Sequence, residues 1–182
     1  MIITKTSLKL ISTTVLIVSS LLWSLTIKAQ QITGPETAFD AKEAKALLEP
    51  GKSIVKGISY YAPKAKIGIR NMNKSTWRMN VNEEVFLYPM TKHLEEWAKM
   101  RKKTTYGNKI YKLSNECMEY YKSAIINEYG KFEIKNIKPG RYWILTNYDW
   151  SGNAYGDEKT LRFEKFIEIK SDGDVSDIKL TN

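Results

Sequence analysis

The chain has 182 residues and 42% of them are hydrophobic, so it is long and apolar enough to bury one substantial core. Its formal net charge is +9, but the basic residues are dispersed apart from a block at 99–103, and no nucleic-acid recognition motif accompanies them. We therefore expect no nucleic-acid partner, while peripheral contact with anionic components of a cell envelope stays open. Cys117 is the only cysteine, which excludes an internal disulfide and predicts a buried thiol, with a reactive or intermolecular thiol as the alternative.

Residues 1–29 are typical of a signal peptide. Lys5 and Lys9 precede an apolar run at 10–27, and Ala29 offers a cleavage point. The run is also close to the minimum length for crossing a bilayer, so an uncleaved N-terminal membrane anchor is the alternative. We expect an exported protein that is periplasmic, displayed on the outer surface, or secreted.

Residues 30–50 are expected to form a helical lead-in to the main domain. Within them, residues 36–48 are rich in Ala, Lys, Glu and Leu, which favour helix, and the Pro50-Gly51 pair ends the segment. The main domain is then expected to span 51–182.

The domain begins with short β-strand patterns. Residues 53–62 are rich in β-branched and aromatic side chains, and residues 66–70 form a second, shorter candidate. Residues 71–82 are predicted to be a loop. The continuous apolar run VFLY at 85–88 is ended by Pro89 and indicates a central strand covered on both faces.

Residues 91–103 interrupt the β pattern with a helix. Leu94 and Trp97 recur at helical spacing, Thr91 can cap the first turn, and acidic residues precede basic ones, as the helix dipole favours. We expect a helical insertion whose Trp97 packs on the sheet, and we expect His93, the only histidine, on the exposed face.

Five further strand segments are predicted: 119–127, the alternating stretch that contains Phe132 and Ile134, 141–148, 161–170 and 175–180. Gly130 is expected at positive φ in a tight hairpin, and Pro139-Gly140 in a type II turn. These turns predict a β-meander, and Asp172-Gly173 predicts another hairpin. About seven short strands with frequent turns indicate a β-sandwich.

Three stretches, GKSIVKG, VFLYP and NEYGKFEIKNIKPGRYWI, together resemble the carboxypeptidase regulatory-like domain. The positions that match its signature are, in order, Gly130, Phe132, Ile134, Ile137, Pro139, Gly140 and Tyr142. Asn127 departs from the pattern, which usually has Asp there. The resemblance covers residues 51–180, is weakest over 67–81, and leaves 91–103 as an insertion.

This resemblance implies an all-β fold, a seven-stranded immunoglobulin-like or transthyretin-like β-sandwich, here with a short N-terminal helix and one helical insertion. Domains of this family accompany others in secreted or surface proteins, assist folding, docking or ligand contact, and carry no catalytic residues. The peptidase domain that gives the family its name is missing from this sequence.

The candidate residues for catalysis or metal binding do not have the spacing that the known motifs require. His93, Glu95 and Glu96 do not form H-E-x-x-H, and the aspartates at 172–177 lack the remaining ligands of a calcium loop. No phosphate-binding loop, C-x-x-C pair or nucleophile elbow is found. We expect no metal, no cofactor and no enzymatic activity, with an unrecognised catalytic site as the weaker alternative.

The loop NYDWSGNAYGDE at 147–158 offers a candidate binding site. Tyr148, Trp150 and Tyr155 alternate there with amides and carboxylates, a combination that suits stacking on a sugar ring or a partner side chain. The alternative for Trp150 is that it caps the end of the core. We expect a non-catalytic secreted or cell-envelope module that binds a protein or glycan partner. A structural or assembly subunit of a surface or secretion complex is the other interpretation.

Overall fold

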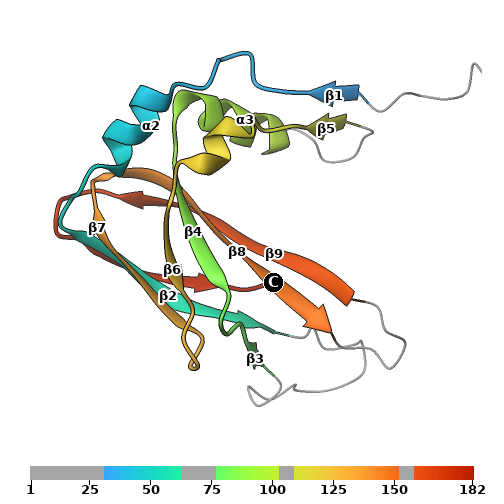
Figure 1. Ribbon diagram of the computed structural model, residues 1–182, viewed down its shortest axis with the longest axis vertical. Helices are drawn as coiled ribbons and strands as arrows, with labels where there is room; N and C mark the ends of the chain where they lie inside the picture. The colour runs from blue at the N-terminus through green and yellow to red at the C-terminus, as the bar shows by residue number, and fades with distance from the viewer. Residues whose placement is uncertain (1–30, 63–76, 103–108, 152–157) are drawn as a thin grey trace, which may run out of the picture.

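A computed structural model describes residues 31–62, 77–102, 109–151 and 158–182. Within these ranges the chain forms two four-stranded sheets packed face to face, with both helices and a small strand pair at one end (Figure 1). The candidate strand at 66–70 lies outside the described residues. The described residues contain no helix long and apolar enough to cross a membrane.

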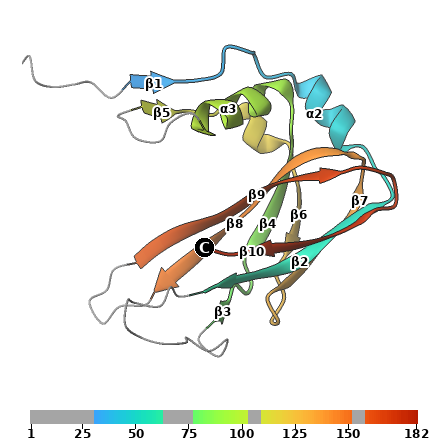
Figure 2. The ribbon, with the colours of Figure 1, turned by 180° about the vertical axis from the view of Figure 1, so that it is seen from behind.

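The first sheet is built around β2 (Ser53–Tyr61). β10 (Val175–Leu180) pairs with it in parallel, while β7 (Lys131–Ile137) and β3 (Arg78–Met79) pair with it in antiparallel fashion. The parallel pair β2–β10 joins the first and last strands of the sandwich, which lie side by side in Figure 2.

The second sheet has the order β6-β4-β8-β9 and is antiparallel throughout. Its strands are β6 (Lys122–Ile125), β4 (Glu84–Pro89), β8 (Gly140–Ser151) and β9 (Glu158–Ile169). β8 and β9 are 12 residues each and pair along their whole length, so they form the longest strand pair of this sheet.

The core lies between the sheets and follows the alternation of each strand. Val55 of β2, Leu87 of β4 and Ile144 of β8 are fully buried in one cluster, to which β7, β9 and β10 also contribute. Because successive side chains of a strand point to opposite faces, the polar residues between them reach the outside. The predicted inward pair Phe132 and Ile134 is confirmed as part of this core.

Helix α2 (Ala41–Leu48) begins at Asp40, whose Oδ1 accepts a hydrogen bond from Lys42 N at 2.8 Å. Its other end meets the sandwich at Tyr142, whose hydroxyl lies 2.9 Å from Lys138 O and 3.2 Å from Leu47 O. Burial raises the pKa of Tyr142 to about 12, so this anchor stays protonated at physiological pH.

Helix α3 (Lys92–Lys102) packs on the outer face of the second sheet, as predicted. The Trp97 ring lies 5.0 Å from that of Trp143, and both belong to a second apolar cluster with Leu94 and Tyr88. At Leu87 and Tyr88, β4 is therefore covered on both faces, as the continuous run VFLY predicted. The short 3-10 helix η2 (Glu116–Glu119) and the parallel pair β1 (Gln31–Thr33) and β5 (Lys109–Tyr111) complete this end.

The prediction of an exposed His93 is wrong. Its side chain is 6% exposed, its Nδ1 lies 2.6 Å from Thr37 O, and its ring meets Phe39 edge-on at 6.0 Å. The N-terminal segment covers this face of α3, and Glu96 holds the same segment by accepting hydrogen bonds from the backbone N–H groups of Glu36 and Thr37. Helical periodicity gives no sign of a distant segment that docks on the helix.

Several further expectations about the strands and turns need correction. The fold is mainly β rather than all-β, because two helices pack on a sandwich of eight strands, not seven. Gly130 takes the expected positive φ of 73°, yet no β-meander forms, because β6, β7 and β8 alternate between the two sheets. Gly140 has a φ of 157°, far from the type II value of about 80°, and already pairs with Ile169. The Asp172-Gly173 turn likewise joins the two sheets, since β10 pairs with β2.

Candidate functional site

The structure places Tyr148, one of the three predicted site residues, in the core. It is 8% exposed and stacks between the rings of Tyr61 and Phe163, each 5.5 Å away. Strand alternation instead sends its neighbours Asn147 and Asp149 to the outer face of the second sheet. Tyr148 is thus a packing residue, and its ring is covered by the two others.

The other two predicted site residues, Trp150 and Tyr155, cannot be placed relative to Tyr148. The backbone of Trp150 pairs with Lys159 in the β8–β9 ladder, but its side chain lies outside the described part of the structure, as does all of Tyr155. A binding role for these two residues stays a prediction.

Exposed aromatic side chains do occur on the outer face of the second sheet, beside α3. We define the outer-face patch as Glu84 and Phe86 of β4, Tyr121 before β6, Asn147 of β8 and Arg162 of β9. Tyr121 is 40% exposed and Phe86 is half-buried. Since α3 covers only the neighbouring part of the sheet around Trp143, these rings remain accessible.

The rings of the patch are held rigidly by one another. Phe86 and Tyr121 meet edge-to-face with centroids 5.1 Å apart, and Tyr88 lies 6.2 Å from the first and 5.7 Å from the second. Tyr88 is buried, which raises its pKa to about 12, while the positive charge of Arg162 acts in the opposite direction. Tyr88 therefore supports the exposed pair as a neutral ring, and its neighbour Trp143 links it to α3.

Polar groups border the apolar surface. Asn147 and Arg162 are direct partners across the β8–β9 ladder, and Glu84 precedes the Val85–Thr146 pair, so the three lie on adjacent strands of the same face. Arg162 is exposed, while Glu84 and Asn147 are half-buried. The patch therefore presents an apolar aromatic area beside a carboxylate, an amide and a guanidinium.

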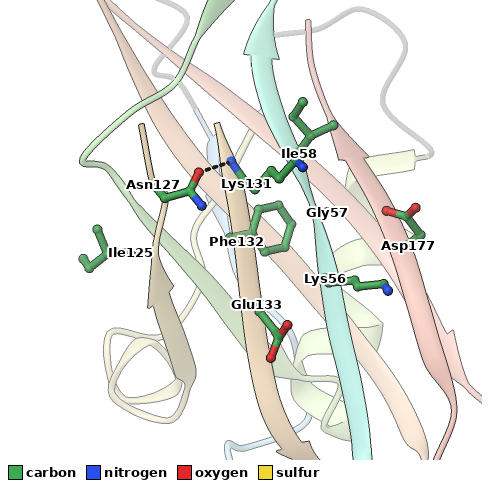
Figure 3. A pocket seen from close by; sticks show the side chains of 9 residues that line it. All are labelled: Lys56, Gly57, Ile58, Ile125, Asn127, Lys131, Phe132, Glu133 and Asp177. Atoms are coloured by element: carbon green, nitrogen blue, oxygen red, sulfur yellow. Dashed lines mark hydrogen bonds between the residues drawn. The ribbon is translucent and has the colours of Figure 1, made fainter. Parts of the chain in front are cut away.

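A second feature is a groove where β6 and β7 diverge into opposite sheets. Its larger hollow has a volume of about 680 Å³ and is drawn in Figure 3. Four charged residues of the first sheet line it: Lys56 on β2, Asp177 on β10, and Lys131 and Glu133 on β7. A smaller hollow of about 520 Å³ continues along β7 and shares Glu133 with the first. Half of the residues that line the groove carry charged or amide side chains.

No group of three or more His, Cys, Asp or Glu side chains comes together as a metal site in the described ranges. Asp174, one of the aspartates considered for calcium, accepts hydrogen bonds from Ser171 N at 2.8 Å and Ser171 Oγ at 2.6 Å, which lower its pKa. Cys117 is buried as predicted, and burial raises its pKa to about 12. These groups have structural roles.

Sequence reasoning missed Phe86 and Tyr121 as site residues because each lies in a stretch that was interpreted only as a β-strand. Phe86 lies inside VFLY, whose continuous apolar pattern gives no face preference, and Tyr121 lies in a segment that was expected to be strand. The two are brought together by the β4–β6 pairing, which no local pattern specifies. The lysine that directly follows Tyr121 in YYK was the available sign that this ring is exposed.

Comparison with known proteins bears on the fold. The chain is similar in structure to a protein from Pseudomonas aeruginosa described as a "putative carbohydrate binding protein (PA1324)", with a TM-score of 0.55 over 82% of this chain and 100% of that one. At 18% identity, this likeness concerns the architecture alone. No protein-family profile and no curated protein matches the chain. The two proteins share a two-sheet β-sandwich.

Proposed function

We propose that this protein is a non-catalytic carbohydrate-binding module that holds a sugar ring on its outer-face patch. The observation that carries the proposal is the Phe86–Tyr121 pair on a sheet face, with Tyr121 exposed and Phe86 half-buried, bordered by Glu84, Asn147 and Arg162. A pyranose ring has an apolar face of C–H groups and a rim of hydroxyls, which match an aromatic surface and its polar border respectively.

The polar border explains selectivity for a polyol over a plain apolar ligand. The Glu84 carboxylate accepts hydrogen bonds from hydroxyls, the Arg162 guanidinium donates them, and the Asn147 amide does both. The main chain at Asn147 is fixed, because its carbonyl accepts a hydrogen bond from Asn80 Nδ2 at 2.8 Å. Such a preorganised surface loses little conformational entropy on binding.

Two further considerations support the proposal without deciding it. The architecture is shared with PA1324, whose description names carbohydrate binding. The signature around Gly130 and Tyr142 also fits a carboxypeptidase regulatory-like module, a membership that we propose on the sequence resemblance. Both point to a binding role rather than to catalysis.

The test is a glycan-array screen of the wild-type protein, followed by calorimetric titration of any ligand found. Tyr121→Ala should weaken binding about tenfold, equivalent to ~1.4 kcal/mol, because the ring loses its stacking contact. Tyr129→Ala is the matched control, since Tyr129 is 65% exposed on the β6–β7 turn and outside the patch. Equal affinity of all three proteins for the ligand would refute the assignment of the site.

Absence of glycan binding together with capture of a protein through the same patch would favour the accessory-subunit interpretation. A Glu84→Gln and Arg162→Gln pair of variants then separates the two cases. Both substitutions keep hydrogen-bonding groups that a sugar can use, while each removes a charge that a protein partner would pair with.

We also propose that the protein is exported and that its mature form begins near Gln30. The Lys-containing start and the apolar run at 10–27 support this placement. Intact-mass measurement on native material tests it, and an intact Met1 in the membrane fraction would establish an anchor instead.

A further inference from the structure

We propose a second binding site, separate from the outer-face patch: the groove between β6 and β7 binds an acidic polysaccharide whose units carry both carboxylate and hydroxyl groups. The inference depends on the shape and charge of the groove and does not require that the outer-face patch bind a sugar.

The groove follows from a hairpin whose strands separate. Asn127 N donates to Lys131 O at 2.8 Å and Gly130 N to Asn127 O at 2.9 Å, so the turn is tightly closed. Beyond it, β6 pairs with β4 and β7 pairs with β2, in opposite sheets. The two strands therefore open into a V, and the hollows of about 680 and 520 Å³ run along it.

Lysines dominate the charged side chains of this groove. Lys56 and Lys131 line the larger hollow, Lys122 and Lys135 line the smaller one, and the opposing acids are Glu133 and Asp177. Four lysines against two carboxylates give a formal charge of +2.

The four lysines are not equivalent. Glu133 already pairs with Lys135 at 2.9 Å, and Lys122 reaches across the V to donate to Asn136 O. Lys131 stands opposite Ile58 in the β2–β7 ladder, with its side chain directed over that residue in Figure 3. Lys131 is thus placed to meet an anion at the mouth of the larger hollow.

The acids decide which kind of anion fits. Lys56 lies between Glu133 and Asp177 across the ladders, so a uniformly anionic surface such as a lipid bilayer would meet repulsion there. A chain of uronate units offers hydroxyls to these carboxylates and carboxylates to the lysines, which satisfies both sets. The concave shape also fits a single extended chain better than a flat membrane.

An oligogalacturonate is a suitable probe, and its methyl ester is the matched neutral ligand, because esterification removes the carboxylate charge and leaves the sugar hydroxyls in place. The wild-type protein should bind the acid form with an affinity that falls as salt rises from about 20 to about 150 mM, and should bind the ester at least about tenfold more weakly.

The Lys56→Gln, Lys131→Gln double variant should lose about tenfold or more of the affinity for the acid form. The control is Lys165→Gln with Lys92→Gln, two exposed lysines outside the groove that remove the same charge. Tyr121→Ala should leave this binding unchanged, which separates the groove from the outer-face patch.

Unchanged binding in the groove variant would overturn the proposal, and so would equal binding of acid and ester. It would also be overturned if the wild-type protein bound phosphatidylglycerol vesicles but not the oligogalacturonate at low salt.

Discussion

A buried asparagine joins the two sheets, and its removal should destabilise the sandwich by a magnitude that the structure allows us to work out. Asn80 is 2% exposed, and its Nδ2 lies 2.8 Å from Asn147 O and 3.3 Å from both Ser59 Oγ and Thr146 Oγ1. Ser59 belongs to β2 and the other two to β8, so one amide spans the space between the sheets.

Asn80→Ala removes about two good hydrogen bonds, because an amide group has two protons to donate. Thr146 Oγ1 keeps its bond to Glu84 O at 2.9 Å and also lies 3.2 Å from Asn147 O, so the Asn147 carbonyl loses the Asn80 donor but keeps a second donor within reach. The loss of two hydrogen bonds at about 1 kcal/mol each predicts a total of about 2 kcal/mol. The same change should loosen Asn147 within the outer-face patch.

Urea unfolding followed by tryptophan fluorescence measures this loss as a lower midpoint at an unchanged slope. Asn115→Ala is the matched control, since Asn115 is exposed and its side chain makes no capping bond, and it should stay within about 0.5 kcal/mol of the wild type. An Asn80→Ala protein as stable as this control would refute the bridging role. Asn80→Asp should be worse than Ala near neutral pH and recover in acid, because only the protonated carboxyl can donate to Asn147 O.

Two further predictions concern α3. Trp97→Ala should lower the free energy of unfolding by about 3–5 kcal/mol in the same urea titration, because the ring packs on Trp143 and under the Arg101 guanidinium. The control Lys99→Ala, on the exposed face of the helix, should cost little, and a small loss for Trp97→Ala would mean that α3 docks without this ring. Hydrogen bonds from Thr37 and from the backbone N–H of Glu36 lower the pKa of Glu96 from 4.5 to about 2. Its stabilising contribution is therefore complete above about pH 4.5 and is lost as pH falls towards 2. The protection of the Thr37 amide, taken as its exchange rate relative to the intrinsic rate at each pH, should fall across that window. Equal protection in Glu96→Ala at neutral pH would exclude the contact.

Local signals determined where strands and turns fall. The alternation around Phe132 and Ile134 placed both in the core, because a strand turns successive side chains to opposite faces whatever its partner. The positive φ at Gly130 was readable for a similar reason, since the cost of a left-handed backbone is intrinsic to the residue. The periodicity of Leu94 and Trp97 likewise gave both the helix and its buried face.

Strand partners were decided only by the tertiary structure. A meander was predicted because neighbouring strands joined by tight turns usually pair, yet β6 and β7 contribute to opposite sheets, and β10 returns to β2 in parallel. Each strand buries its apolar face against either sheet equally well, so the choice depends on how all eight strands together close the core. No window of a few residues contains that information.

The candidate site was likewise indicated in part by the sequence and decided in part by the tertiary structure. The sequence itself indicated that aromatic and polar side chains alternate near Tyr148, but the ladder registers turned this ring inward and left Asn147 outside. Phe86 and Tyr121 become neighbours only because β4 pairs with β6, and the packing around them leaves Phe86 half-buried and Tyr121 exposed. His93 was misjudged for the same physical reason: exposure is a property of what packs against a residue, and its covering segment comes from elsewhere in the chain.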